Sequence, residues 1–195
     1  EVIDLLGREA GCEAEISQIT SQAMRGELDF ETSLRERVAL LKGLPISVLD
    51  IVFKFIHLSQ NAQEFISILQ KKGILVGLVS GGFAPMVERL AKSLGISYFS
   101  ANQLEVKDGF LTGRLVGEIV TGQVKKATLE RWRKELELSK ERTIAIGDGA
   151  NDLLMLKSAG RGIAFCAKEV VKTEIASHID TRDFLEVLPL IDFLE

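Results

Sequence analysis

Two aspartates flank a glycine-rich loop in the sequence IAIGDGAND, which spans residues 144–152. An apolar run ends at Gly147, and Asp148 follows at the point where the predicted strand meets the loop. A carboxylate in this place suits a hard cation, because such cations take oxygen ligands. Asp152 lies near the start of the next predicted helix, where a carboxylate also serves as an ordinary N-cap. Taken alone, this motif leaves the metal-site and N-cap interpretations both open.

A second polar segment, VSGGF at residues 79–83, follows another apolar run. We expect Ser80 to end a strand, and Gly81 and Gly82 to expose backbone N–H groups before a helix. A hydroxyl and unshielded amides at a helix N-terminus suit a phosphate group. An ordinary strand-to-helix turn explains the same residues. Because ligands of parallel α/β sheets bind beyond the carboxyl ends of the strands, two such polar strand ends in one sheet favour the ligand-site interpretation.

Basic residues on two predicted helices are further candidates. Lys125 and Lys126 open a helix, where a positive charge is unfavourable to the helix dipole. They are either solvated charges or cations delivered to a bound phosphate. Arg37 lies near Arg35 on a helix whose other side is apolar, and this pattern favours a solvated arginine face.

The elements that must position these residues fall into two parts. Residues 1–58 carry successive amphipathic helical patterns with short turns, which are typical of a small helical bundle. From residue 59, apolar runs alternate with helices, which predicts an α/β fold with a parallel sheet covered on both faces. The expected strands cover residues 74–80, 96–102, 143–148 and 162–166. The expected helices cover residues 61–72, 85–94, 121–136 and 151–158. A β-hairpin with Asp108-Gly109 at its turn is expected at residues 104–116.

The composition limits the classes of partner. The 195 residues are 46% hydrophobic and 27% charged, with a net charge of −4 and scattered lysines and arginines, so we expect no nucleic-acid partner. No apolar run approaches the roughly 20 residues that span a bilayer, so we expect no membrane partner. The only cysteines, Cys12 and Cys166, lie far apart in sequence, and we expect buried free thiols in a reducing cytoplasm.

Segments spread over the whole chain form a specific set of motifs. They are EVIDLLGREAG, LDFETSLRERVALLKGLP, VSGGF, ANQLEVKDGFLTG, GDGANDLLMLKSAG and IAFCAK. Together they resemble the phosphoserine phosphatases of the haloacid dehalogenase superfamily. The resemblance implies a Rossmann-like core at residues 59–195 and a helical cap over the site at residues 1–58. It also implies Mg²⁺-dependent hydrolysis of a small molecule, L-phosphoserine, to serine and phosphate in serine biosynthesis. We expect a monomer or homodimer.

The resemblance assigns roles at both ends of the substrate. At the phosphate end, Ser80 and Gly81 hold the phosphoryl oxygens, Lys125 neutralises them, Asp148 binds magnesium, and Asn151 and Asp152 support this shell, with Asp152 orienting Lys125. At the amino-acid end, Glu1 meets the amino group and Arg37 pairs with the carboxylate in a bidentate contact. Met24 and Phe30 form an apolar wall that excludes water.

One motif of the superfamily is missing. Its members begin with an apolar strand that lies in the middle of the sheet and ends in Asp-x-Asp-x-Thr or Asp-x-Asp-x-Val. The first aspartate attacks phosphorus and the second protonates the leaving serine oxygen. Here the match begins at Glu1, and no Asp-x-Asp occurs anywhere in the sequence.

We therefore expect the nucleophile in about 20 preceding residues of the parent polypeptide and no activity in the chain as given. The alternatives are an inactive phosphoserine-binding protein and a related phosphatase for another small phosphomonoester.

Overall fold

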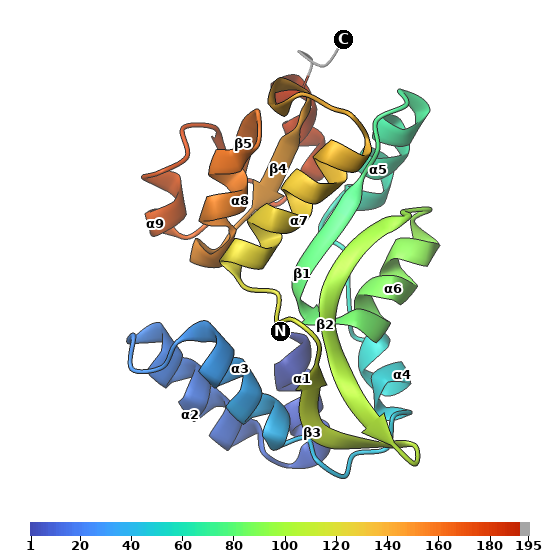
Figure 1. Ribbon diagram of the computed structural model, residues 1–195, viewed down its shortest axis with the longest axis vertical. Helices are drawn as coiled ribbons and strands as arrows, with labels where there is room; N and C mark the ends of the chain where they lie inside the picture. Colours follow the sequence, from blue (N-terminus) through green and yellow to red (C-terminus); the bar gives the residue numbers. More distant parts are fainter. Residues whose placement is uncertain (192–195) are drawn as a thin grey trace. The chain divides into compact units, whose positions relative to one another are not determined.

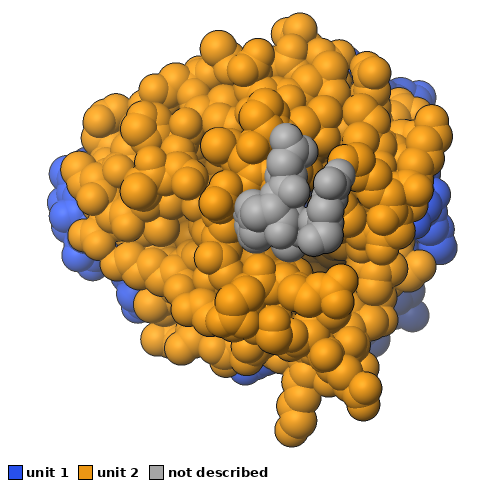
Figure 2. Space-filling view, turned by 90° about the horizontal axis from the view of Figure 1, so that it is seen from above, with its two compact units in different colours: residues 1–57, 80–95, 99–119 blue, residues 58–79, 96–98, 120–195 orange. Residues whose placement is uncertain are grey.

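The computed structural model describes residues 1–191 and divides the chain into two compact units, which are coloured separately in Figure 2. Unit 1 comprises residues 1–57, 80–95 and 99–119, and unit 2 comprises residues 58–79, 96–98 and 120–195. Along the chain, the first change from unit 1 to unit 2 lies between residues 57 and 58. Residues 80–95 and 99–119, which we expected in the core, belong to unit 1 by compactness. A cap role for residues 1–58 stays a prediction.

Unit 1 opens with successive helices, as the sequence predicts for residues 1–58 (Figure 1). They are α1 (Val2–Ala10), α2 (Glu13–Met24), α3 (Phe30–Ala39) and α4 (Val48–Phe53), and α6 (Ala84–Ser93) follows later in the chain. Asp29 is the N-cap of α3, and its side chain accepts a hydrogen bond from the Thr32 backbone N–H at 2.9 Å. Apolar side chains of these helices form much of the core of unit 1, with Leu6 and Ile16 fully buried, and Leu41, just after α3, is fully buried as well.

The β2 strand (Tyr98–Lys107) and the β3 strand (Phe110–Val116) form the predicted antiparallel hairpin. Lys107 pairs with Phe110, so Asp108 and Gly109 make a two-residue turn. Their φ angles of 52° and 83° are those that a type I′ turn requires, which explains the Asp-Gly sequence. The β2 strand also pairs with β1 (Gly77–Phe83), so this sheet has the order β1-β2-β3.

Unit 2 contains the parallel strands β4 (Ile144–Gly147), β5 (Arg161–Phe165) and β6 (His178–Ile179), in the order β4-β5-β6. Its helices are α5 (Ala62–Lys71), α7 (Gly122–Glu135), α8 (Leu153–Ser158) and α9 (Glu169–Lys172), with 3₁₀ segments η1 (Lys140–Arg142), η2 (Ala150–Asp152) and η3 (Phe184–Leu190). The buried side chains of Ala145, Leu156 and Val171 belong to one apolar cluster here. The predicted α/β class with parallel strands and flanking helices is confirmed. Among the described residues, no helix is long and apolar enough to cross a bilayer.

The strand predicted at residues 74–80 is displaced. Its first residues belong to the end of α5, because the Ile74 N–H donates to the Leu69 carbonyl and the Gly73 N–H to the Gln70 carbonyl, the pattern of a Schellman motif. The strand starts at Gly77 and continues to Phe83, so Ser80 does not end it, contrary to our expectation. Cys166 is also only half-buried, which corrects the expectation of two buried thiols.

Candidate functional site

A buried ion pair links α7 to the loop after β4 in unit 2. The Lys125 Nζ lies 2.6 Å from the Asp152 Oδ1, and the two residues are only 6% and 5% exposed. The Asp152 Oδ2 accepts hydrogen bonds from the backbone N–H groups of Asp148 and Gly149, both at 3.1 Å. Both carboxylate oxygens therefore have donors, which offsets the cost of burying the charge and fixes the direction of the lysine.

This geometry bears on two alternatives that the sequence left open. The Asp152 carboxylate makes no capping bond to α8, but it accepts from the Gly149 N–H at the start of η2, so it has a capping contact and also the ion pair with Lys125. Lys125 is buried, so it is not a solvated charge. The neighbouring Lys126 is half-buried and lies 3.7 Å from Glu130 on the same helix, as a surface lysine does.

Small residues make room for this arrangement. A Cβ at Gly147 would lie 2.6 Å from the Asp152 Cβ, a separation that real Cβ atoms essentially never show. A Cβ at Gly122, the first residue of α7, would lie 2.9 Å from the Asn151 backbone oxygen. The α7 helix and the Asp148–Asp152 segment therefore pack closely enough for Lys125 to reach Asp152.

The remaining predicted residues of this segment differ in exposure. Asp148 is exposed, and within residues 1–191 no hydrogen bond or ion pair engages its carboxylate. Asn151 is half-buried beside Gly149. In the described part of the chain, no three His, Cys, Asp or Glu side chains cluster as a metal site. Asp148 therefore offers a single carboxylate to a cation.

In unit 1, Ser80 and Gly81 lie within β1 and are half-buried. The Gly82 N–H donates to the Ser80 Oγ at 3.0 Å, so this amide is not unshielded as we had expected. The helix that follows starts only at Ala84. Of the predicted features, the Ser80 hydroxyl remains, and the Gly82 N–H of the same strand holds it in position.

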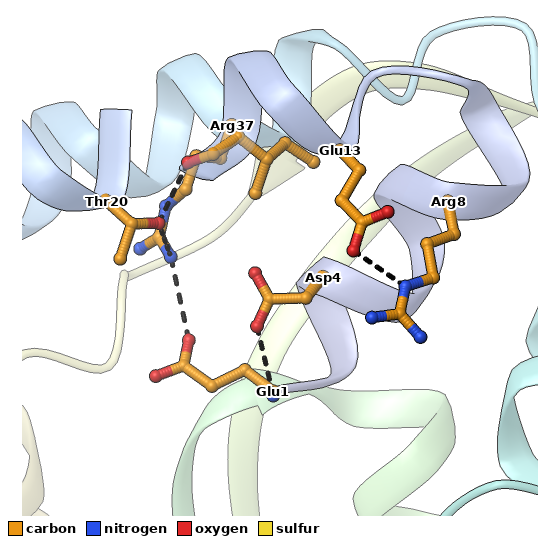
Figure 3. A network of polar contacts seen from close by, with 7 residues as sticks. Glu1, Asp4, Arg8, Glu13, Thr20 and Arg37 are labelled. Atoms are coloured by element: carbon orange, nitrogen blue, oxygen red, sulfur yellow. Dashed lines mark hydrogen bonds and ion pairs between the residues drawn. The ribbon is translucent and has the colours of Figure 1, made fainter. Parts of the chain in front are cut away.

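Arg37 is buried in unit 1, and Figure 3 shows its guanidinium between Thr20 and Glu1. Its side chain is 8% exposed, whereas Arg35 is half exposed and pairs with Glu31 on the surface of α3. The expectation of a solvated arginine face is thus wrong for Arg37. The Arg37 Nε donates to the Ser33 carbonyl at 3.2 Å, and its NH1 lies 3.6 Å from the Glu1 Oε2.

The structure places the two residues of the predicted apolar wall on either side of the turn between α2 and α3. Met24 ends α2 and is 74% exposed, whereas Phe30 begins α3 and packs partly buried against the unit 1 core. Neither has a contact that assigns it to a wall, so this role stays a prediction.

Thr20 and Asn102 are polar residues near the predicted site that our sequence reasoning missed. The Thr20 Oγ1 donates to the Ile16 carbonyl at 2.9 Å and accepts from the Arg37 NH1 at 3.4 Å (Figure 3). The Asn102 Nδ2 donates to the Gly81 carbonyl at 2.7 Å. The available signal was an amide inside the apolar strand YFSANQLEV, whereas a threonine in a helix gives no such signal.

The predicted site residues thus form one group in each unit. Glu1, Met24, Phe30, Arg37, Ser80 and Gly81 belong to unit 1, and Lys125, Asp148, Asn151 and Asp152 belong to unit 2. Unit 1 contributes a paired acid and base together with a fixed hydroxyl. Unit 2 contributes a buried cation and an exposed carboxylate. The paired groups of unit 1 suit a charged ligand group, and the buried cation of unit 2 suits an anion.

Comparison with known proteins gives consistent matches over the whole chain. The family described as haloacid dehalogenase-like hydrolase matches residues 3–157. A phosphoserine phosphatase of Streptococcus thermophilus is 54% identical over 192 residues, which are 98% of this chain and 89% of that protein.

Solved structures match equally widely. A substrate-bound phosphoserine phosphatase complex superimposes with a TM-score of 0.92 at 45% identity, over 98% of this chain and 91% of that one. A phospho-aspartyl intermediate analogue of phosphoserine phosphatase gives a TM-score of 0.91 at 45% identity, over 98% and 92% of the two chains.

Proposed function

Because the chain belongs to the haloacid dehalogenase-like hydrolases, we propose that it acts in the hydrolysis of L-phosphoserine to serine and phosphate. The 54% identity to a phosphoserine phosphatase over nearly the full length of both chains supports this substrate. The observation that carries the proposal is the buried Arg37 beside Glu1. An acid and a base 3.6 Å apart match the amino and carboxylate groups of a zwitterion, which an ordinary phosphomonoester lacks.

At the amino-acid end, the Arg37 guanidinium binds the substrate carboxylate through two parallel N–H donors, and Glu1 accepts from the ammonium group. Burial strengthens the arginine contact, because little water competes for the guanidinium. The Ser33 carbonyl and the Thr20 hydroxyl engage Nε and NH1, so the fork is already oriented before a substrate arrives.

At the phosphate end, Ser80 and the backbone of Gly81 bind phosphoryl oxygens, and Lys125 supplies a positive charge. The Asp152 carboxylate holds the Lys125 ammonium in one direction, so little reorganisation is needed when the phosphoryl charge is redistributed. Asn151 adds an amide to the same segment. These residues bind and orient the phosphoryl group, and none of them is an activated nucleophile.

A magnesium ion fits the donor set of the loop after β4. Magnesium is commonly bound by one or two carboxylates together with substrate phosphate and water, and Asp148 is an exposed carboxylate without a described partner. Asp148 would hold the ion, while Asp152 is already engaged by Lys125 and two backbone amides. When bound, the ion would supply charge neutralisation at the phosphoryl oxygens.

The attacking aspartate, which forms an aspartyl-phosphate intermediate, comes from a strand outside residues 1–195. Two observations support this part of the proposal: the sequence contains no Asp-x-Asp, and β4 is an edge strand that pairs only with β5 among the described strands. In α/β proteins, a parallel strand that is covered by helices normally lies in the interior of its sheet, because unpaired backbone N–H and C=O groups are costly when buried. A strand paired to the open edge of β4 would bring its C-terminal residues near Asp148.

The missing motif also favours a second candidate, a phosphoserine-binding protein without activity. Both candidates share the ligand and differ only in turnover. Phosphate release from phosphoserine by the complete protein therefore distinguishes the enzyme from the binding protein. Variants of Arg37 test the substrate specificity separately.

The test of substrate class compares Arg37→Ala with Arg35→Ala, a matched control two residues away on the surface of α3. In the complete protein, we expect Arg37→Ala to lower kcat/KM for phosphoserine by roughly 30-fold or more, which corresponds to the ~2–5 kcal/mol of an unpaired buried charge. Phosphoethanolamine lacks the carboxylate, so its slow hydrolysis should hardly change. Arg35→Ala should leave both substrates unaffected.

Arg37→Lys should restore phosphoserine hydrolysis only in part, because a point charge cannot reproduce the planar fork. Equal losses for phosphoserine and phosphoethanolamine in Arg37→Ala would make Arg37 a structural residue and would remove the amino-acid specificity from the proposal.

A further inference from the structure

Asn102 is a polar side chain in an apolar place. It lies on β2 and is 1% exposed, and the next inward-facing residue, Leu104, belongs to the apolar core of unit 1. An amide costs free energy to bury unless its polar atoms are hydrogen-bonded, so an apolar side chain would be the simpler choice at this position. The Asn102 Nδ2 donates to the Gly81 carbonyl at 2.7 Å, which is a short bond for an amide donor.

This bond sets the orientation of the next peptide unit. A peptide group is planar, so fixing the carbonyl of Gly81 also fixes the direction of the Gly82 N–H on the other side of the same plane. That N–H donates to the Ser80 Oγ at 3.0 Å. Asn102 and Ser80 are therefore joined through one rigid peptide group.

Gly82 has a steric reason to lack a side chain. A Cβ at this position would lie 3.1 Å from the Ser80 Oγ, which is tighter than nine in ten real Cβ contacts, so the hydroxyl would have to shift. With glycine there, the hydroxyl can fold back over the strand and accept the Gly82 N–H. That bond uses a lone pair of the hydroxyl oxygen and leaves the hydroxyl hydrogen available to be donated to a ligand.

We propose that Asn102 is a positioning residue for phosphate binding, which acts through the Gly81–Gly82 peptide on the Ser80 hydroxyl. This inference rests on the proposed function only in taking Ser80 and Gly81 as the phosphate-binding residues. Asn102 does not touch the ligand. The Asn102 amide fixes the orientation of the Gly81–Gly82 peptide, and the Gly82 N–H of this peptide fixes the Ser80 hydroxyl. A phosphoryl oxygen would therefore bind a donor that is already oriented.

The test measures the affinity of the complete protein for inorganic phosphate, by calorimetry in the presence of Mg²⁺. The variant Asn102→Leu keeps the size of the side chain but removes the donor, and Asn102→Asp keeps its shape but faces the Gly81 carbonyl with an acceptor. We expect both to raise the Kd for phosphate about tenfold, the equivalent of one well-placed hydrogen bond. Gln103→Leu, at the exposed neighbouring position on the same strand, should leave the Kd unchanged.

Thermal unfolding of the same variants separates positioning from a purely structural role. An Asn102→Leu protein with a lower Tm but an unchanged Kd for phosphate would overturn the inference. If neither Asn102 variant folds, Gly82→Ala tests the other end of the same chain of contacts. Its added methyl group should displace the Ser80 hydroxyl and weaken phosphate binding, and an unchanged Kd in that variant would also overturn the inference.

The wild-type result distinguishes this inference from the proposed function. A protein that binds phosphate but does not hydrolyse phosphoserine would contradict the proposed activity and still allow the Asn102 comparison. A wild-type protein that does not bind phosphate would overturn the positioning role itself, because there would be no phosphate site to position.

Discussion

At the scale of single residues, the ion pair between Lys125 and Asp152 links stability to chemistry. The pair is buried, and the carboxylate also accepts two backbone N–H groups. Removing one partner of such a pair leaves an uncompensated buried charge, which costs about 3–5 kcal/mol. The same lysine is the cation that we propose for the phosphoryl group, so its loss should affect both the fold and turnover.

We predict that Lys125→Met lowers the free energy of unfolding by about 3 kcal/mol, whereas Lys126→Met changes it by less than about 0.5 kcal/mol. The two lysines are adjacent, but only Lys125 is buried. Urea unfolding of both variants measures the difference. In the complete protein, kcat should fall more than phosphoserine affinity on removing Lys125, because its charge matters most when the phosphoryl charge is redistributed.

An unchanged kcat in Lys125→Met would remove Lys125 from the site. Similar unfolding free energies for the two variants would show that the ion pair contributes little to stability.

Paired basic residues also show where sequence reasoning stops. Arg35 and Arg37 lie two apart on one helix, and Lys125 and Lys126 lie side by side, yet one of each pair is buried and the other is not. Periodicity gives the apolar face of a helix, but it does not show which basic residue has an acidic partner distant in sequence. Only the resemblance to a known family indicated Arg37 and Lys125.

At the scale of elements, most helices and the hairpin could be predicted because each has a local cause. The Asp108-Gly109 turn gives the hairpin, and Gly11 ends α1 in a left-handed conformation. The limits of β1 were wrong because they depend on partners. Ile74 belongs to the capping motif of α5, and β1, which pairs with β2, continues through Ser80 to Phe83 despite its glycines. Neither interaction is visible in a single apolar run.

The N-cap of α3 gives an element-scale prediction on pH. The hydrogen bond from the Thr32 backbone N–H, followed by that from the Thr32 hydroxyl, lowers the pKa of Asp29 below its ordinary value. A carboxyl group whose pKa is lower in the folded state stabilises the fold above its unfolded value of about 3.9, and this contribution is lost as the pH falls through the folded value.

We therefore expect Asp29→Ala to lower the Tm by about 2–4 °C near neutral pH, and this difference from wild type should shrink in acid. Thermal unfolding between roughly pH 2 and pH 7 measures it. Glu36→Ala, at an exposed position on the same helix, serves as the control without a capping bond. A Tm difference for Asp29→Ala that does not change with pH would contradict the capping role.

At the scale of the whole molecule, the residues that we propose to bind and orient a phosphorylated amino acid belong to two units, and none of them is an activated nucleophile for attack on phosphorus. Unit 1 holds Arg37, Glu1 and Ser80, and unit 2 holds Lys125 and Asp148. The sequence has no Asp-x-Asp, and β4 has an open edge among the described strands. We therefore assign specificity to residues 1–195 and the covalent step to a strand outside them.

The most direct measurement is Mg²⁺-dependent release of phosphate from L-phosphoserine, made side by side on two proteins. One is the polypeptide of residues 1–195, and the other is the complete protein, in which the Asp-x-Asp strand is proposed to precede residue 1. We predict release by the complete protein, none above the buffer blank by residues 1–195, and loss of activity when the first aspartate of the motif is replaced by asparagine. Phosphate release by residues 1–195 alone, or none by the complete protein, would contradict this division of roles.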